Sequence, residues 1–525
     1  MRRNAIIMAA GTASRFAPLS YEKPKALLRV KGEILIERQI RQLQEAGISE
    51  IIVVVGYMAE KFMYLNEKYG VKIVFNEDYN RYNNTSSVIR IINELSDTYL
   101  CSSDNFFSEN VFIESPKDSY YSALYSDGET GEYCLTTDEK NNIVDVKVGG
   151  CDSWYMVGHV FFNKEFSEKF REIMKKEYNR KETRLGYWED VYVRYINELP
   201  PMKIHRYMPH DIEEFDSLDE LRRFDKEYIN NTGCKMFQNI CSILKCEEKD
   251  IYEIDVLKKG MTNCSFAFSC RKNSLKYVYR HPGAGTERLV NRDNEQYALH
   301  VAREIGLDKT FVYMHPTEGW KISVYIENVE TLNSTSIQRH DNMDKIVDIY
   351  RRLHHTNLQL KTTFNIFHEI DKYDKLIEQT GATMYEGWEL VRNQVMDLKN
   401  RLDCLGIDLH PCHNDAVAEN FIKAPEGTIY LIDWEYSGMN DPMADFAALF
   451  LESSFTPENQ NYIISNYYDG IIPDGTFEKI QYYQILWDFL WAQWTIIKEA
   501  NGDDFGTYGI DRFHRGILNL QKLRN

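Results

Sequence analysis

The chain has 525 residues and a formal net charge of −18, with 43% hydrophobic and 27% charged residues. One hydrophobic core does not serve a chain of this length, so two domains of ordinary size are expected. The negative charge argues against a nucleic-acid partner, because phosphate backbones are bound by basic surfaces. It favours small cationic ligands, although the surface of an ordinary soluble protein would carry the same charge.

The ten cysteines are scattered, without a C-x-x-C pair or a Cys/His ligand spacing. Free thiols in a reducing compartment are therefore expected, rather than disulfides or a zinc site. The opening MRRNAIIMAAG imitates a signal peptide, but its apolar run is short, and no later stretch approaches the roughly 20 apolar residues of a spanning helix. We expect a cytoplasmic protein without a membrane span, whose first apolar run is a buried strand.

The first part of the chain alternates strand and helix patterns, as in a largely parallel α/β sheet. The expected strands are 4–10, 50–56, 71–76, 132–137, 143–148 and 156–163, with another that begins at 98 and runs into Asp104. The expected helices are 35–47, 61–70, 83–95 and a polar helix at 217–230. We place a boundary in NNTG, so that domains of 1–230 and 231–525 are expected. The second domain begins with hairpin strands in 253–270 and 275–281 and continues with long helices.

The first expected strand runs directly into the turn GTASRF, which presents a series of backbone N–H groups. Such turns bind phosphate without side chains. Arg15 and Lys25 add positive charge for a triphosphate, and Asp104 is expected at the carboxyl end of its strand, where open α/β sheets place ligands. A carboxylate there can hold Mg²⁺. The turn by itself would fit a dinucleotide site or a purely structural role equally well.

The combination of G-T-A-S-R, P-K and S-D-N resembles the nucleoside-triphosphate transferases, and within them the bacterial CTP:phosphocholine cytidylyltransferases. The resemblance extends over about residues 4–225 and includes YNNTSSV, YWEDV and EEFDSLDEL. It implies a Rossmann-like domain with a mixed sheet. By the same resemblance Gly11, Thr12, Arg15 and Lys25 hold the nucleotide, Arg15 and Lys25 serve catalysis, and Asp104 and Asp216 hold the metal. Ala13 departs from the family, which usually has a second glycine there.

The acceptor end of this domain is expected among aromatic residues. Trp154, Tyr187 and Trp188 could enclose a trimethylammonium group by cation–π contact, with Glu189 or Asp190 close by. Half-buried packing is an equally good interpretation of each of these aromatic residues.

HPCHNDAVAENFI, from His410, brings a histidine, an acid and an amide together. Two short strands follow, and pairing them about the turn at 426–427 places Asn420 opposite Asp433. An amide oxygen and a carboxylate that converge form a Mg²⁺ site. Asp415, on the loop that enters the hairpin, can accept a proton from an incoming hydroxyl. This is the arrangement of a kinase.

Upstream features occur in the kinase order. A turn carries Gly260, Thr262 and Asn263, which could cover phosphates; Arg280 follows on a strand, and Glu295 begins a helix and could pair with Arg280. Protein kinases have H-R-D, D-F-G and a strand lysine where this chain has H-N-D, D-W-E and an arginine, which binds phosphate bidentately. The set resembles choline and ethanolamine kinases, relatives of the aminoglycoside phosphotransferases, and implies their two-lobed, protein-kinase-like α+β fold over about residues 235–525.

ILWDFLWAQWTIIKEA places Trp487, Trp491 and Trp494 on one face of a helix. Such a stripe is usually core, but a face of indoles is also what a quaternary ammonium needs. In choline kinases a Trp-x-x-Trp pair on a late helix lines the choline pocket, and Trp491 with Trp494 has that spacing. The resemblance, rather than the spacing, favours choline.

Together the two resemblances imply a bifunctional enzyme that uses Mg²⁺ at both sites. The second domain would phosphorylate choline with ATP, and the first would join phosphocholine to CTP, releasing pyrophosphate and forming CDP-choline. Three alternatives stay open: ethanolamine or another amino alcohol as substrate, a sugar-1-phosphate nucleotidyltransferase as the first domain, and a non-catalytic scaffold with decayed sites. A homo-oligomer is compatible with the sequence, which does not report the oligomeric state.

Overall fold

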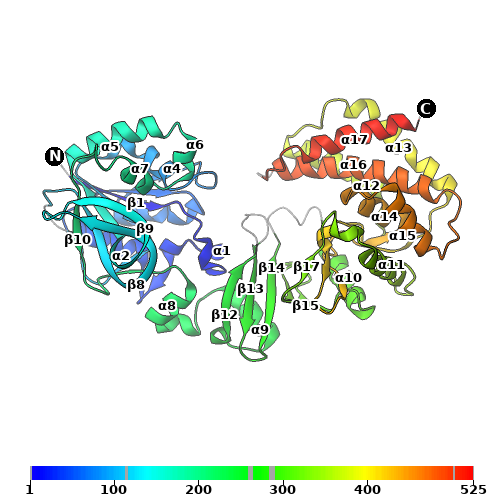
Figure 1. Ribbon diagram of the computed structural model, residues 1–525, viewed down its shortest axis with the longest axis horizontal. Coiled ribbons are helices and arrows are strands. Elements are labelled where there is room, and N and C mark those ends of the chain that lie inside the picture. Colours follow the sequence, from blue (N-terminus) through cyan, green and yellow to red (C-terminus); the bar gives the residue numbers. More distant parts are fainter. Residues whose placement is uncertain (1–2, 113–115, 258–263, 283–289, 501–502, 524–525) are drawn as a thin grey trace. The chain divides into compact units, whose positions relative to one another are not determined.

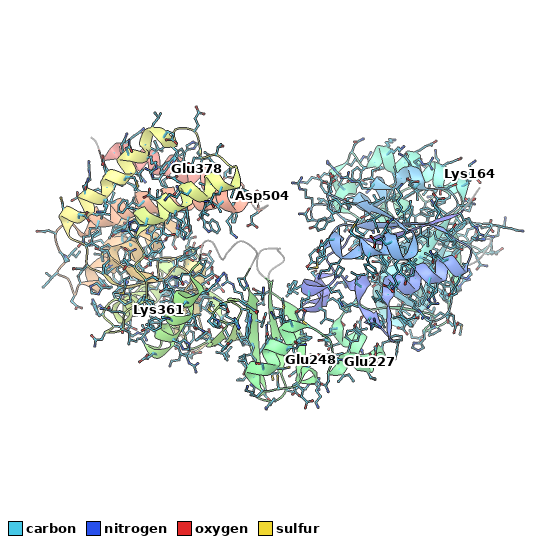
Figure 2. All side chains as sticks on the ribbon, turned by 180° about the vertical axis from the view of Figure 1, so that it is seen from behind. Lys164, Glu227, Glu248, Lys361, Glu378 and Asp504 are labelled. Carbon is cyan, nitrogen blue, oxygen red and sulfur yellow. The ribbon has the colours of Figure 1, made fainter. Side chains whose placement is uncertain are left out.

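The computed structural model describes residues 3–112, 116–257, 264–282, 290–500 and 503–523. By compactness the chain forms two units, Met1–Val256 and Leu257–Asn525 (Figure 1). The domain boundary at residue 230 stays a prediction. Figure 2 shows the charged side chains on the outside of each unit, for example Lys164 in the first and Glu378 in the second, both of which are exposed.

A seven-stranded sheet in the order β10-β8-β9-β6-β1-β4-β5 forms the centre of the first unit. Its strands are β1 (Asn4–Ala9), β4 (Glu50–Val55), β5 (Lys72–Phe75), β6 (Thr98–Ser102), β8 (Tyr120–Thr137), β9 (Ile143–Phe162) and β10 (Lys203–Arg206). β1 is parallel to β4 and β6, whereas β9 is antiparallel to β6 and β8. The sheet is therefore mixed, as expected.

Helices pack on both faces of this sheet: α2 (Leu35–Glu45) and α3 (Tyr64–Tyr69) belong to one core, and α4 (Thr85–Arg90), α5 (Lys164–Glu177) and α7 (Trp188–Arg194) belong to the other. The unit also contains α1 (Leu19–Glu22), α6 (Lys181–Leu185), α8 (Leu218–Phe224) and α9 (Lys235–Leu244). Ala5 and Ile7 of β1 pack in one core with α2, whereas Ile6 packs in the other with α5 and α7. After Asn4 β1 is apolar, because its side chains are largely buried on both faces of the sheet.

One long hairpin, β8–β9, replaces the separate short strands expected between 132 and 163. The part of β8 before residue 132 contains Gly128 and Gly131. The hairpin accommodates them at irregularities of register, which lie at Ser126–Glu129 and Thr130–Tyr133. Glycine in a strand often marks such a bulge. The polar helix expected at 217–230 is α8 followed by a short 3-10 helix, Lys226–Ile229.

Four strands in the sheet order β13-β14-β16-β15 begin the second unit. They are β13 (Cys264–Cys270), β14 (Leu275–His281), β15 (Phe311–Met314) and β16 (Lys321–Val324), and β12 (Ile251–Val256) is the last strand of the first unit. Helix α10 (Arg292–Glu304) packs with β15. The expected strand at 275–281 is β14.

The rest of the second unit is mainly helical around one core. Its helices are α11 (His340–His354), α12 (Ile366–Thr380), α13 (Trp388–Leu405), α14 (Pro442–Glu452), α15 (Pro457–Tyr467), α16 (Thr476–Ala500) and α17 (Tyr508–Lys522). Short strands β17 (Glu330–Thr331), β18 (His410–Cys412), β19 (Phe421–Lys423), β20 (Ile429–Leu431) and β21 (Gly438–Asn440) carry the loops between them. No helix within the described ranges combines the length and hydropathy that crossing a bilayer requires.

Candidate active sites

The turn after β1 lines a cavity of about 350 Å³ at the carboxyl edge of the sheet. Gly11 borders this cavity, and open space lies where a side chain would project from it. A phosphate could therefore approach its backbone closely. Thr12 is exposed in the same turn. Ala13 adopts a left-handed backbone (φ 46°), so the departure from the family falls at a position whose conformation favours glycine.

The two cations expected to hold phosphate each pair with an expected metal ligand. The Lys25 ammonium lies 2.9 Å from a carboxylate oxygen of Asp104, and its side chain is 9% exposed. The Arg15 guanidinium lies 3.0 Å from Asp216, with 75% of its side chain exposed. The structure therefore brings all four residues to one edge of the sheet, although they come from segments far apart in the chain.

A two-stranded ribbon explains why the carboxylates converge. β7 (Asn105–Phe107) pairs antiparallel with β11 (Ile212–Glu214), and Asn105 lies opposite Glu214. Asp104 directly precedes β7, and Asp216 follows β11. Burial, and then the charge of Asp104, raises the pKa of Glu214 to about 8. Such a concentration of carboxylate oxygens fits a divalent cation with the preferences of Mg²⁺, so the residues present fit the metal.

The predicted aromatic cage is not assembled around YWEDV. Trp188 is buried and stacks on Tyr121 at 5.9 Å between ring centroids, within the core that contains α5. Glu189 accepts hydrogen bonds from Asn84 and Tyr121, and burial raises its pKa to about 7. Asp190 caps α7 by accepting from the backbone N–H of Tyr187 at 2.8 Å. These acids are engaged in holding the fold.

The other two members of the predicted cage lie on different surfaces. Tyr187 is exposed and borders the cavity beside the turn after β1. Trp154 packs edge-on against Tyr125, and the guanidinium of Arg206 lies over its ring. Trp154 points to one face of β9, and Tyr155 points to the other. Strand alternation explains the separation, because neighbouring residues of a strand point to opposite faces.

A second cavity, which the sequence reasoning missed, lies beside Asp216 and has a volume of about 440 Å³. Its lining combines carboxylates with tyrosine rings, including Glu132, Glu213, Glu214, Tyr125 and Tyr155. Burial and the charge of Asp216 raise the pKa of Glu132 as well. Carboxylates and aromatic rings together suit a cationic ligand. The signal was present in EEFD, where the acids Glu213 and Glu214 shortly precede the expected metal ligand Asp216.

In the second unit, the loop between β18 and β19 carries the expected base. Burial, and then the charge of Asp433, raises the pKa of Asp415 to about 8, which suits a proton acceptor near neutral pH. Asn420 donates its amide to the Asp415 carbonyl at 2.9 Å and carboxylate at 3.2 Å. In the part of the chain that the structure describes, no hydrogen bond reaches the Asn420 side-chain oxygen, which leaves it available to a metal. With the Asp433 carboxylate, this donor set fits Mg²⁺.

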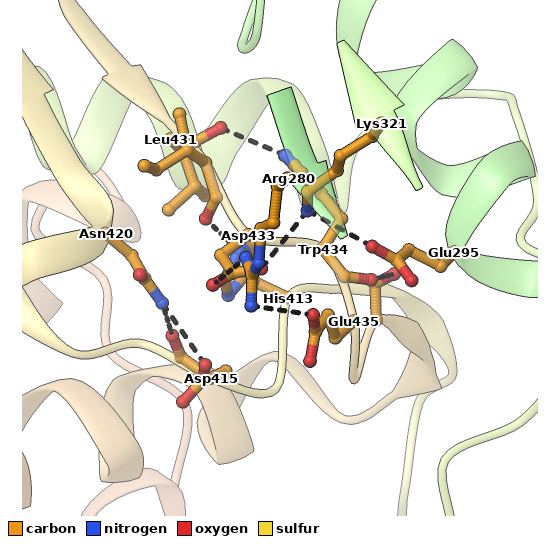
Figure 3. Close-up of polar contacts among 12 residues, drawn as sticks. Arg280, Glu295, Lys321, His413, Asp415, Asn420, Leu431, Asp433, Trp434 and Glu435 are labelled. Atoms are coloured by element: carbon orange, nitrogen blue, oxygen red, sulfur yellow. Dashed lines mark hydrogen bonds and ion pairs between the residues drawn. The ribbon is translucent and has the colours of Figure 1, made fainter. Parts of the chain in front are cut away.

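The hairpin register differs by one residue from the prediction. Phe421 lies opposite Leu431, and the Ile432 N–H donates to the Asn420 carbonyl at 2.9 Å, so that Ile432 rather than Asp433 lies opposite Asn420. Asp433 has a left-handed backbone (φ 69°), which ends the strand alternation there. Figure 3 shows Asp415, Asn420 and Asp433 together on these neighbouring segments.

Asp445 of α14 holds the loop that carries Asp415 by accepting hydrogen bonds from it. The Asp445 carboxylate accepts the backbone N–H groups of His413 (2.9 Å) and Asn414 (2.7 Å) and lies 3.1 Å from His354 Nε2. Burial lowers the pKa of His413, whose Nε2 lies 3.0 Å from the Ile432 carbonyl and so must donate to it. His354, Cys412 and Asp445 cluster as metal ligands do, but the Asp445 oxygens already serve backbone amides.

The predicted pair of Arg280 and Glu295 is not formed directly. Arg280 donates to both oxygens of Asp433, at 2.8 and 2.9 Å, and lies 2.9 Å from Glu435 (Figure 3). Glu295 pairs instead with Arg292 at 2.6 Å, three residues earlier on α10, and no ion pair joins Glu295 to Arg280 among the residues described. Arg292 and Glu295 are three residues apart on one helix, so their side chains are neighbours on its surface. Gly260, Thr262 and Asn263 lie outside the described residues, so their role stays a prediction.

The tryptophan stripe of α16 extends from the core toward Tyr436, because Trp487 and Trp491 are buried core residues and Trp494 packs, partly buried, against that core. Trp487 is fully buried, donates its N–H to the Ala444 carbonyl at 3.0 Å and stacks on Trp491. Trp491 meets the Tyr436 ring edge-on at 5.3 Å, and Trp494 donates its N–H to the Tyr436 hydroxyl at 3.0 Å. Tyr436, which the sequence reasoning missed, follows D-W-E directly, and burial raises the pKa of its hydroxyl well above the usual range.

The comparisons with known proteins cover both halves of the chain. Residues 254–516 match the family model described as choline/ethanolamine kinase, and residues 5–106 match the MobA-like NTP transferase domain.

Individual relatives match one half each. A 2-aminoethylphosphonate cytidylyltransferase from Lancefieldella rimae is 37% identical over 43% of this chain and 94% of its own length. A choline-phosphate cytidylyltransferase from Streptococcus pneumoniae is 34% identical over 42% of this chain and 96% of its own length. The crystal structure of the choline kinase LicA from Streptococcus pneumoniae is 41% identical and covers 54% of this chain and 97% of its own, with a TM-score of 0.49.

Proposed function

The chain belongs to the choline/ethanolamine kinase family and carries a MobA-like NTP transferase domain ahead of the kinase, and from this premise we propose that it makes CDP-choline in two steps. The kinase domain phosphorylates choline with ATP. The first domain transfers the cytidylyl group of CTP to the phosphocholine. The product of one site is then the substrate of the other, which gives a reason for their fusion.

In the first step, Asp415 accepts the proton of the choline hydroxyl while that oxygen bonds to the γ-phosphorus of ATP and ADP leaves. Arg280 provides positive charge for the phosphates. The Asn420 amide oxygen and Asp433 would hold Mg²⁺, which, when bound, neutralises charge on the phosphates in transfer. Positioning and charge neutralisation are what phosphoryl transfer chiefly requires of a protein.

In the second step, a phosphate oxygen of phosphocholine bonds to the α-phosphorus of CTP and pyrophosphate leaves. Lys25 and Arg15 neutralise the charge that develops there, and Asp104 and Asp216 would hold Mg²⁺ as in the first step. We assign the ammonium end of the acceptor to the acidic, tyrosine-lined cavity beside Asp216, in place of the cage expected from the sequence.

One observation carries the proposal for the kinase substrate: Tyr436, whose side chain contacts Trp491 and Trp494, is hydrogen-bonded through its backbone to the loop that carries the base. Asn414, which precedes Asp415, donates its side-chain amide to the Tyr436 carbonyl at 3.1 Å. An aromatic surface beside the proton acceptor suits an alcohol that carries a quaternary ammonium group. Ethanolamine lacks the methyl groups that would contact these rings.

The acceptor of the first domain has a second candidate. The relative that acts on 2-aminoethylphosphonate is at least as similar to this chain as the choline-phosphate enzyme, and the carboxylates of the second cavity would also suit a primary ammonium. We expect phosphocholine to give the highest kcat/KM, because the kinase domain supplies it. Assays with phosphocholine, phosphoethanolamine and 2-aminoethylphosphonate decide the point, and a preference for the phosphonate would contradict the two-step proposal.

The test of the whole proposal is ³¹P NMR of the purified protein with Mg²⁺, ATP, CTP and choline. Phosphocholine should appear first, followed by CDP-choline and pyrophosphate. Phosphocholine that accumulates alone would refute the acceptor assignment, and the absence of any choline-dependent product would refute the kinase substrate. Omitting Mg²⁺ should abolish both steps. We also propose a cytoplasmic location, supported by the demand for ATP and CTP and by free thiols at the nine cysteines assigned in the described residues.

A further inference from the structure

Lys321 belongs to none of the motifs that identify the kinase site, yet it lies within that site. It is the first residue of β16 and sits directly across from Arg280 in the pairing of β14 with β16. Directly opposed residues of antiparallel strands point to the same face. Both side chains reach the same acid: Lys321 Nζ lies 3.4 Å from Asp433 Oδ1, the oxygen that Arg280 contacts at 2.8 Å.

Lys321 also completes a closed ring of alternating charges. Its ammonium lies 3.2 Å from Glu295, which lies 2.6 Å from Arg292. Arg292 lies 3.7 Å from Glu435, and Glu435 lies 2.9 Å from Arg280. With the contacts of Asp433, the ring has three cations and three carboxylates. Each of the six side chains is at most 26% exposed, so these charges interact more strongly than surface pairs do.

The ring gives each cation beside Asp433 a second carboxylate that the other does not share. Arg280 has Glu435, and Lys321 has Glu295. A metal ion on Asp433 would compete with both cations for its oxygens. Each cation would keep its other partner, which holds the charge in place, and would have hydrogen-bond donors left for phosphate oxygens.

We propose that Lys321 is a second phosphate-binding cation of the kinase site, and that Glu295 is the residue that positions it. The sequence predicted that Glu295 of α10 could pair with Arg280 on β14. In the structure Glu295 pairs instead with Lys321, on the neighbouring strand β16. A lysine fits this place because its compact ammonium can serve Glu295 and a phosphate together, while the planar guanidinium of Arg280 spans two oxygens.

A purely structural ion pair is the competing interpretation, and it predicts a different pattern. If Lys321 only neutralised Glu295, its loss would lower thermal stability and leave nucleotide binding unchanged in the folded protein. If it binds phosphate, the affinity for MgATP falls while the KM for choline stays near its wild-type value.

The experiment compares Lys321→Met and Lys321→Arg with a matched control, Lys423→Met, in the full-length chain. Lys423 is a similarly covered lysine (17% exposed against 12%) that pairs with Asp341 outside the ring. Binding of the non-hydrolysable analogue AMP-PNP with Mg²⁺ is measured by calorimetry, and the KM values for ATP and choline by phosphocholine production. Thermal unfolding is recorded for every variant.

We expect Lys321→Met to weaken AMP-PNP binding about 10- to 100-fold, the loss typical of one hydrogen bond to a charged group. Lys321→Arg should recover part of the affinity, and Lys423→Met should bind as wild type does. If Lys321→Met does not fold, the double variant Lys321→Met/Glu295→Gln, which removes the pair as a unit, replaces it. Affinities within twofold of wild type for whichever of these folds would overturn the proposal.

The inference rests on the proposed kinase function, and the two can fail separately. A wild-type protein that binds AMP-PNP but does not phosphorylate choline would refute the substrate, and the binding comparison would still test Lys321. A wild-type protein that phosphorylates choline, with a Lys321→Met variant equal to the control, would refute only the role of Lys321.

Discussion

Glu189 shows how a single residue can carry a pH dependence that the sequence does not reveal. Its pKa is raised to about 7, chiefly by burial, whereas a glutamate in the unfolded chain titrates near 4.5. Between these values the native protein holds a proton that the unfolded chain has released. The first unit should therefore lose stability as the pH rises from 4.5 to 7, by at most about 3 kcal/mol.

Glu189→Gln should remove this dependence. The amide stays neutral and can still accept from Asn84, while the Tyr121 hydroxyl can accept in place of donating. Calorimetric unfolding should show a higher Tm for the variant than for wild type at pH 8, and equal values at pH 4.5. Glu182→Gln, an exposed neighbour in α6, is the control and should change neither. An unchanged Tm at pH 8 would mean that native Glu189 is already ionised without loss of stability.

The residue scale also shows what the sequence could predict. Asp415 and Asn420 could be predicted because both lie in one loop, so that residues close in the sequence are also close in the structure. A short helical segment does not reveal that Trp188 is buried or that Glu189 accepts hydrogen bonds from Asn84 and Tyr121, so their part in an acceptor site stays a prediction. Glu214 and Lys321 were missed because they approach their partners only through strand pairing, and no local pattern in the sequence marks such a pairing.

At the scale of elements, α14 holds the catalytic loop through one carboxylate. Asp445 accepts two buried backbone N–H groups with its two oxygens. Asp445→Asn keeps the shape but turns a donor toward one of those groups, which leaves a buried N–H unsatisfied at about 1–3 kcal/mol. We expect a lower Tm and a lower kcat for choline phosphorylation, with the KM for choline little changed. A variant that is less stable but has wild-type kcat would show that the loop keeps its place without Asp445.

Helix α16 offers a second test at this scale, because one stripe serves two purposes. Trp487→Ala should cost about 3–5 kcal/mol of stability, as expected for a buried aromatic side chain. Trp491→Ala should raise the KM for choline more than that for ethanolamine, because the trimethylammonium group gains more from aromatic contact. Steady-state kinetics with both alcohols, alongside thermal unfolding, checks the division. Equal effects on the two alcohols would show that Trp491 serves only packing, as Trp487 does.

At the scale of the whole molecule, the same electrostatic arrangement occurs twice. In each unit, cations expected to hold phosphate pair with carboxylates expected to hold metal, as Lys25 does with Asp104 and Arg280 with Asp433. The similarity follows from a shared problem, since both reactions move a phosphorus centre between oxygens and need its charge neutralised. The residues that meet this need belong to separate compact units of the chain.

Because Lys25 and Asp104 belong to one unit and Asp415 and Asp433 to the other, the two activities should be lost one at a time. Asp415→Asn removes the proton acceptor and should lower choline phosphorylation about 10²- to 10⁴-fold, while CDP-choline formation from supplied phosphocholine stays at the wild-type rate. Lys25→Met should do the reverse, with a loss of about 10²- to 10³-fold in cytidylyl transfer. Each variant is the control for the other, and mixing the two proteins should restore CDP-choline synthesis from choline through free phosphocholine. If Asp415→Asn slowed the supplied-phosphocholine reaction more than twofold, the units would be coupled, and the chain would have to be treated as one catalytic system.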